Sequence, residues 1–293
     1  MANTLFIEVP PNFSFQATIY SHGWCELLPF ELDEVNWRLN YVFSDPGSGI
    51  SVSAVISQEA ERVRVDLDNS NVDPERVKKD VRHILRLDED LNAFYQKLDR
   101  HGGLEWVTEK RAGRLLRSAT VFEDLVKTIC TTNCSWALTK IMVANLVEKL
   151  GNPAGNGKNA FPTAVAMAGV TEDFYRNEIR AGYRSPYFVE LADAVGSGNL
   201  DPQAWLTSGL STSDLKKEMK KVKGVGDYAA ENLLKLVGRY DGLALDSFLR
   251  SQFYKKHNGE KVCKDSKIER HYKKFAPWSG LAIWCDMTEK WII

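Results

Sequence analysis

The chain has 293 residues, of which 44% are hydrophobic and 26% are charged, and its formal net charge is −1. This length provides for one or two domains with a sizeable core, so a disordered chain is excluded. The chain contains no apolar run of about 18 residues, and its first residues lack the basic start and apolar centre of a secretory signal. We therefore expect an intracellular protein that does not cross a membrane.

The amino-terminal third is expected to form an antiparallel sheet with one solvated face, because apolar and polar residues alternate there. The alternating segments are residues 13–19, 37–43 and 63–67. Asp73 and Pro74 mark the start of a helix, and the helical pattern continues to Leu98. These features predict a β-sheet domain with a helix over residues 1–105.

From Trp106 onward, apolar residues recur at helical spacing and predict a helical domain over residues 106–293. The fold class expected for the whole chain is therefore α+β, mostly α with an amino-terminal antiparallel sheet. Within the second domain, helices are expected at 119–130, 137–150, 161–168, 172–181 and 186–195.

Residues 211–239 predict a helix, a Gly-x-Gly turn and a second helix, in which Gly224-Val225-Gly226 separates Ser211–Lys221 from Tyr228–Leu236. Asp227 is expected to be the N-cap of the second helix. Two glycines permit positive φ angles and leave the N–H groups of the turn open to an anion, for which a DNA phosphate is the natural candidate. Five lysines surround this turn, opposed in sequence only by Glu218: Lys216, Lys217, Lys220, Lys221 and Lys223.

Asp246 follows the second glycine by about twenty residues and precedes another helical segment. This pattern resembles the helix-hairpin-helix DNA glycosylase superfamily, in its 8-oxoguanine and 3-methyladenine (alkylpurine) branches. In that family the hairpin grips the DNA backbone and the aspartate is the catalytic carboxylate, so the resemblance implies catalysis by Asp246. It also implies DNA contacts by Lys223, Gly224, Val225, Gly226 and Ser247. The alternative is a turn that only joins two packed helices, with Asp246 as a helix cap.

The resemblance extends to three other segments. Asn133 matches a residue that fills the gap left by the flipped nucleotide, although a helix cap or Asx turn is the alternative. Tyr183 and Arg184, in the pattern Gly-Tyr-Arg-x-x-Tyr, match residues that wedge beside the target and lie at the lesion, although Tyr183 could also be a core residue. Trp136 is expected either to stack on DNA or the base or to lie in the core. The base pocket implied by the resemblance contains Trp136, Tyr228, Ile283 and Met287.

Bifunctional members of the family carry a nucleophilic lysine where this chain has Tyr228, which predicts a monofunctional glycosylase without AP-lyase activity. Ile283 and Met287 replace the Gln and Phe of the 8-oxoguanine branch, and the many aromatic residues suit a cationic alkylated purine. An alkylated purine is therefore the first expected substrate. The alternatives are an 8-oxoguanine glycosylase, with or without lyase activity, and a helix-hairpin-helix protein that binds DNA without catalysis.

No cofactor is expected to be required. The resemblance implies a monovalent cation, K+ or Na+, held by the hairpin carbonyls of Lys220, Val222 and Val225. It implies no iron–sulfur cluster, because only Cys263 and Cys285 lie near the carboxyl terminus. The expected partner is double-stranded DNA with a damaged base, bound by a monomer that would be nucleoid-associated in the cytoplasm of a prokaryote or nuclear in a eukaryote.

Overall fold

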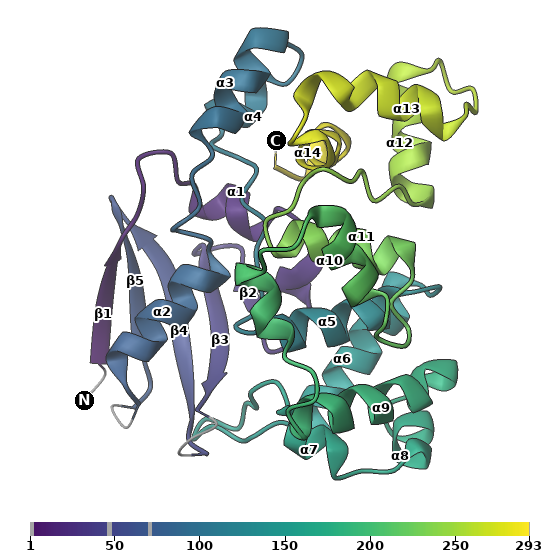
Figure 1. Cartoon of the computed structure of the whole chain (residues 1–293). Helices are drawn as coiled ribbons and strands as arrows, with labels where there is room; N and C mark the ends of the chain where they lie inside the picture. The colour runs from purple at the N-terminus through teal and green to yellow at the C-terminus, as the bar shows by residue number, and fades with distance from the viewer. Residues whose placement is uncertain (1–2, 46–48, 70–71, 293) are drawn as a thin grey trace.

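An antiparallel five-stranded sheet lies at one side of the molecule, with α2 (Pro74–Ile84) across one of its faces (Figure 1). The computed structural model describes residues 3–45, 49–69 and 72–292. The sheet has the order β1-β5-β4-β3-β2. Its strands are β1 (Asn3–Glu8), β2 (Glu31–Asp33), β3 (Arg38–Ser44), β4 (Ser51–Glu59) and β5 (Arg62–Leu67).

The alternation of apolar and polar residues that predicted β3 and β5 also sets the register of the sheet. In β4 and β5, Ile56 pairs with Val65 and Ala54 pairs with Leu67, and all four side chains are buried. The strand expected at residues 13–19 is wrong, because Phe15–Ile19 forms the short helix α1. The Ser14 hydroxyl accepts a hydrogen bond from the Ala17 amide, so a local cap competes successfully with the strand pattern.

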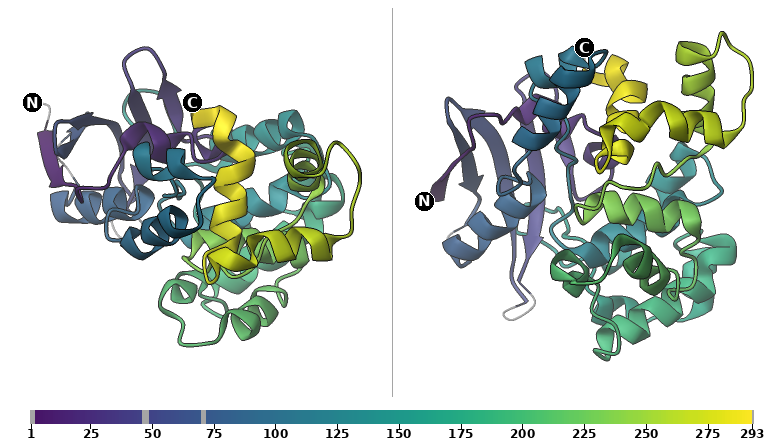
Figure 2. Two further views of the ribbon diagram at one scale, coloured as in Figure 1. Left: turned by 90° about the horizontal axis from the view of Figure 1, so that it is seen from above. Right: turned by 45° about the horizontal axis from the view of Figure 1, so that its top comes forward.

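After β5 the described residues form helices joined by loops, which confirms the expected α+β class. In both views of Figure 2 the strands stay on one side of the molecule and the helices from α5 onward lie on the other. None of the helices in residues 3–45, 49–69 and 72–292 is both long and apolar enough to span a bilayer. The α-helices after α2 are α3 (Asn92–His101), α4 (Glu105–Glu109), α5 (Val121–Thr131), α6 (Trp136–Leu150), α7 (Ala164–Ala168), α8 (Glu172–Asn177), α9 (Ser185–Gly196), α10 (Thr212–Met219), α11 (Asp227–Leu236), α12 (Ser247–His257), α13 (Asp265–Tyr272) and α14 (Ser279–Ile292). Short 3₁₀ helices are η1 (Gly23–Glu26), η2 (Gly182–Arg184), η3 (Pro202–Thr207) and η4 (Lys273–Phe275).

One continuous apolar core joins the sheet to the helices. A buried polar network crosses it: the Tyr41 hydroxyl of β3 donates to Glu123 Oε2 over 2.7 Å, and Glu123 Oε1 pairs with Lys127 Nζ at 2.7 Å. Helix α3 lies before the predicted domain boundary at residue 105, yet its Phe94 ring lies 6.3 Å from the ring of Trp278. The boundary therefore stays a prediction, and the sheet and the helices support each other through shared contacts.

Candidate active site and nucleic-acid interface

A cleft of about 1740 Å³ brings together segments that are far apart in the sequence. Its walls come from η1, the loop between α5 and α6, the turn between α10 and α11, the start of α12 and one face of α14. Of the residues predicted to bind or act on a ligand, the cleft includes Asn133, Trp136, Tyr183, Lys220, Val222, Lys223, Gly224, Val225, Gly226, Tyr228, Asp246 and Ser247. The cleft does not include Arg184, Ile283 or Met287.

Asp246 is half-buried at the edge of this cleft, immediately before α12. Its Oδ1 accepts a hydrogen bond of 2.7 Å from the Leu249 amide, so it is the N-cap of that helix. Oδ2 has no hydrogen-bond partner among the residues that the structure describes. The cap thus fixes the orientation of the carboxylate while one oxygen remains available to a molecule in the cleft, so capping and catalysis are compatible roles.

The turn between α10 and α11 has the geometry that its two glycines permit. Gly224 has a φ of 90°, and a Cβ added there would lie 2.8 Å from Tyr187 Cδ2. The Val225 amide donates to the Val222 carbonyl over 3.0 Å, which closes the turn. Gly226, not Asp227, is the N-cap of α11, and a Cβ added at Gly226 would meet nothing within 4 Å. The backbone at Gly226 is therefore open to a ligand.

Each of the five lysines around the turn pairs with a carboxylate, which corrects the expectation that only Glu218 opposes them. Because most of these pairs are largely exposed, each stabilises the fold little, and a phosphate can compete for the ammonium groups at small cost. The pairs are Lys216 with Asp227 and Glu231, Lys217 with Asp214, Lys220 with Asp227, Lys221 with Glu218, and Lys223 with Glu190.

The loop between α5 and α6 places Asn133 on the surface with a φ of 47°. Tyr183 is 47% exposed, and its hydroxyl donates to the Thr132 carbonyl over 3.2 Å. Arg184, in contrast, is only 3% exposed and donates to the carbonyls of Ile129 and Thr132. This corrects the predicted DNA contact of Arg184. Its guanidinium holds the Asn133 loop from inside by donating to carbonyls at the end of α5, where the α-helical i+4 partners are missing.

Trp136 faces the cleft and is also held by the protein. Its indole N–H donates to Glu26 Oε2 over 3.1 Å, and a Cβ added at Gly23 would lie 2.5 Å from its ring. The ring is half-buried, so it combines features of the two roles predicted for it. Gly23 and Glu26 were not predicted as site residues, since their contact with Trp136 joins segments more than a hundred positions apart.

The predicted pocket residues of the final helix require a correction. Ile283 is fully buried and Met287 is 7% exposed, and neither lines the cleft. Trp284 and Trp291 line it instead, with ring centroids 5.8 Å apart. These two tryptophans lie seven positions apart and therefore share one face of the helix. The family pattern had instead predicted that the face with Ile283 and Met287 would lie toward the base.

Lys235 is the principal cleft residue that was not predicted. It lies on α11, is 2% exposed, and its ammonium is 4.9 Å from the centroid of the Trp284 ring. Burial lowers the pKa of Lys235 from 10.5 to about 8. The spacing of residues in the sequence could have identified Lys235 as a cleft residue. Tyr228, Asn232 and Lys235 follow one another at helical intervals of four and three and therefore share one face of α11.

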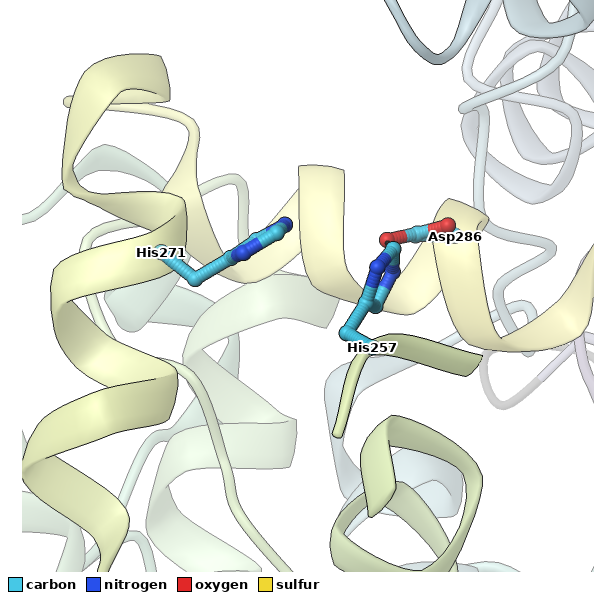
Figure 3. A group of neighbouring side chains, drawn as sticks. All are labelled: His257, His271 and Asp286. Carbon is cyan, nitrogen blue, oxygen red and sulfur yellow. Dashed lines mark hydrogen bonds and ion pairs between the residues drawn. The ribbon is translucent and has the colours of Figure 1, made fainter. Parts of the chain in front are cut away.

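A second group of titratable side chains, His257, His271 and Asp286, comes from α12, α13 and α14 (Figure 3). Asp286 Oδ2 lies 2.7 Å from His257 Nε2, and Oδ1 pairs with Lys256 Nζ at 2.7 Å. The Tyr272 hydroxyl also donates to Oδ2 over 2.6 Å. Since both carboxylate oxygens are engaged and a lysine ammonium adjoins them, we interpret this group as a connection between helices.

Known proteins resemble this chain in sequence and in fold. No protein-family model matches the chain. A curated probable N-glycosylase/DNA lyase from Methanothermobacter thermautotrophicus is 24% identical over 250 residues, covering 75% of this chain and 77% of that protein.

Similar solved structures cover almost the whole chain. MBOgg1 in complex with a low-affinity DNA ligand has a TM-score of 0.78 at 19% identity, covering 99% of this chain and 98% of that one. A 3-methyladenine DNA glycosylase from Archaeoglobus fulgidus has a TM-score of 0.76 at 19% identity and 97% coverage of both chains. The 8-oxoguanine glycosylase/lyase of Clostridium acetobutylicum, without ligand, has 0.72 at 21% identity, covering 97% and 96%. The resemblance found in the sequence is therefore confirmed at the level of structure: the chain has the fold of the helix-hairpin-helix DNA glycosylases.

Proposed function

We propose that this protein is a DNA glycosylase that flips a damaged purine out of duplex DNA and hydrolyses its N-glycosidic bond. The observation that carries the proposal is the position of Asp246, whose carboxylate lies in a large cleft bordered by the glycine turn. A protein that only binds DNA needs no oriented carboxylate in such a cleft. The shared fold supports the same conclusion.

The proposed reaction follows from the carboxylate and the backbone N–H groups that line the cleft. A base inside a duplex cannot be reached, so the nucleotide is extruded into the cleft. As the N-glycosidic bond breaks, positive charge develops on the deoxyribose, and the Asp246 carboxylate stabilises that charge and orients the attacking water. The exposed N–H groups at Gly226 and the start of α11 bind a backbone phosphate, which holds the sugar in place.

The position two residues after Gly226 distinguishes hydrolysis from lyase chemistry. It is occupied by Tyr228, a half-buried phenol whose pKa is raised by burial, so a neutral hydroxyl stands where bifunctional enzymes place an amine. We expect the protein to release a free base and to leave an intact abasic strand that breaks only after alkali. Sodium borohydride should trap no covalent protein–DNA adduct above the background of a heat-inactivated sample. Efficient trapping, or strand breaks without alkali, would show a lyase.

Two classes of damaged purine are candidate substrates. An alkylated purine, the first expectation from the sequence, suits the aromatic side chains of Trp136, Tyr228 and Trp284. An oxidised purine such as 8-oxoguanine is the second candidate, and the ammonium of Lys235 favours it, since a carbonyl oxygen on the base would accept a hydrogen bond there. A release assay on duplexes with methylated, deaminated and oxidised purines separates the classes, and failure to release any base would contradict the proposed function.

The glycine turn offers a test of DNA binding that leaves the fold intact. In Gly226→Ala the new Cβ meets no atom of the described residues within 4 Å, but it stands where a phosphate would approach the backbone. We expect the affinity for duplex DNA to fall about tenfold, roughly the loss of one charge-assisted hydrogen bond, with an unchanged melting temperature.

Gly155→Ala is the matched control, because Gly155 also has open space around it and lies outside the cleft. Gly224→Ala should instead lower the melting temperature, owing to its positive φ and the Tyr187 ring. Titration of labelled duplex at fixed salt measures the affinities. Equal affinities for Gly226→Ala and the wild-type protein would exclude this turn from the DNA interface.

A further inference from the structure

Lys235 is an almost fully buried charged group that lines the cleft. Its side chain is 2% exposed, and its Nζ has no hydrogen-bond partner among the residues that the structure describes. No ion pair with a described carboxylate involves it, although Asp246 and Glu231 are close enough to favour its charged form. Burying an unpaired ammonium is costly, so this position suggests that a partner is supplied by a molecule in the cleft.

The position of Lys235 on α11 indicates which part of a nucleotide it would meet. Tyr228 is half-buried beside the turn, where the DNA backbone is expected, and Lys235 lies seven residues further along the same helical face. Seven residues correspond to about 10 Å along a helix axis. Lys235 is thus well removed from the phosphates, and its ammonium lies against the Trp284 ring, a surface on which a planar base can stack.

The surroundings of the ammonium restrict the chemistry of that base. Lysine offers three donors and no acceptor, so it can bind only an acceptor atom such as a carbonyl oxygen or an unprotonated ring nitrogen. The pKa of about 8 keeps Lys235 mostly charged at neutral pH. A purine that carries a positive charge, such as 7-methylguanine, would be repelled at short distance in a cleft from which water is largely displaced.

We propose that Lys235 is a specificity-determining residue, whose ammonium donates a hydrogen bond to an acceptor on the edge of a neutral flipped purine and disfavours cationic purines. The proposal rests on the glycosylase function proposed above and narrows its substrate to neutral damaged purines, whether alkylated, deaminated or oxidised. It also replaces the expectation that aromatic faces in the cleft receive a cationic base, because the Trp284 face already receives a cation from the protein itself.

The test compares single-turnover release of hypoxanthine or 8-oxoguanine with release of 7-methylguanine from otherwise identical duplexes. In Lys235→Met the ratio of the neutral-base rate to the 7-methylguanine rate should fall about 10- to 100-fold, the effect of losing one charge-assisted hydrogen bond and a repulsion. Lys235→Gln, which keeps a donor without the charge, should fall between the wild-type protein and Lys235→Met. Melting temperatures of both variants confirm that they are folded.

A structural role for Lys235 would change both rates by the same factor, and that result would overturn the inference. Borohydride trapping that depends on Lys235 would also overturn it, because the amine would then attack C1′ of the sugar instead of binding the base. If the wild-type protein releases no base from any of these duplexes, the proposed function fails first, which distinguishes the two failures.

Discussion

Replacing Asp246 by asparagine is expected to reduce base release by about 100-fold or more, while DNA binding and the melting temperature stay near those of the wild-type protein. Asparagine can still accept the hydrogen bond from the Leu249 amide, so the cap of α12 is kept. What is lost is the negative charge that stabilises the developing positive charge on the sugar. Single-turnover release followed by alkali and strand separation measures the rate, and titration of labelled duplex measures the affinity.

Asp241→Asn is the matched control, since Asp241 is an exposed carboxylate five residues earlier and lies outside the cleft. Its release rate should equal that of the wild-type protein. If Asp246→Asn instead retained a comparable rate with the same affinity, Asp246 would be only a helix cap and the catalytic assignment would be wrong.

The second large effect concerns the buried pair of Glu123 and Lys127. Lys127→Met should lower the free energy of unfolding by about 3–5 kcal/mol, because it leaves the Glu123 carboxylate buried without its cation. The Tyr41 hydroxyl would remain as a hydrogen-bond donor to Glu123, but it carries no charge. Denaturant unfolding at pH 7 measures the change, and a free energy within error of the wild-type value would contradict this account of the core.

Lys235→Met is the informative contrast, because it removes a buried lysine that pairs with no carboxylate in the part of the chain that the structure describes. Burial lowers the pKa of Lys235 from 10.5 in the unfolded chain to about 8, which costs stability on the order of 3 kcal/mol at neutral pH. The variant should therefore be more stable than the wild-type protein. The gain should be greatest below pH 8 and should vanish toward pH 10.5, where the unfolded lysine also loses its proton. A loss of stability in Lys127→Met and a gain in Lys235→Met would distinguish a buried lysine that supports the fold from one that is retained for function.

Local patterns were sufficient to predict most of the helical architecture. The glycine turn, its flanking helices and the helix after Asp246 were all found within a residue or two of their positions, since glycines and caps act over a few residues. The helix at Phe15–Ile19 was not found, because alternation of apolar and polar residues is compatible with both structures over so short a segment.

The sequence did not predict the role of site residues whose position depends on contacts between distant segments. Asp246 and the turn line the same cleft, and their closeness in the chain made both of them candidate site residues in the sequence. Arg184 is buried and donates a hydrogen bond to a carbonyl of α5, about fifty positions away. Nothing in the segment around Arg184 indicates this contact. Lys235 lines a cleft formed by several distant segments, and the Trp284 ring against it comes from α14.

The most direct test of the central claim is a crystal structure of the Asp246→Asn variant bound to duplex DNA that contains a damaged purine. We predict that the target nucleotide is extruded into the cleft, with a phosphate on the amides at Gly226 and C1′ beside the side chain at position 246. The base should lie against Trp284 within hydrogen-bonding distance of Lys235. A duplex bound on another face, or a target base still stacked in the helix with the cleft empty, would contradict the account.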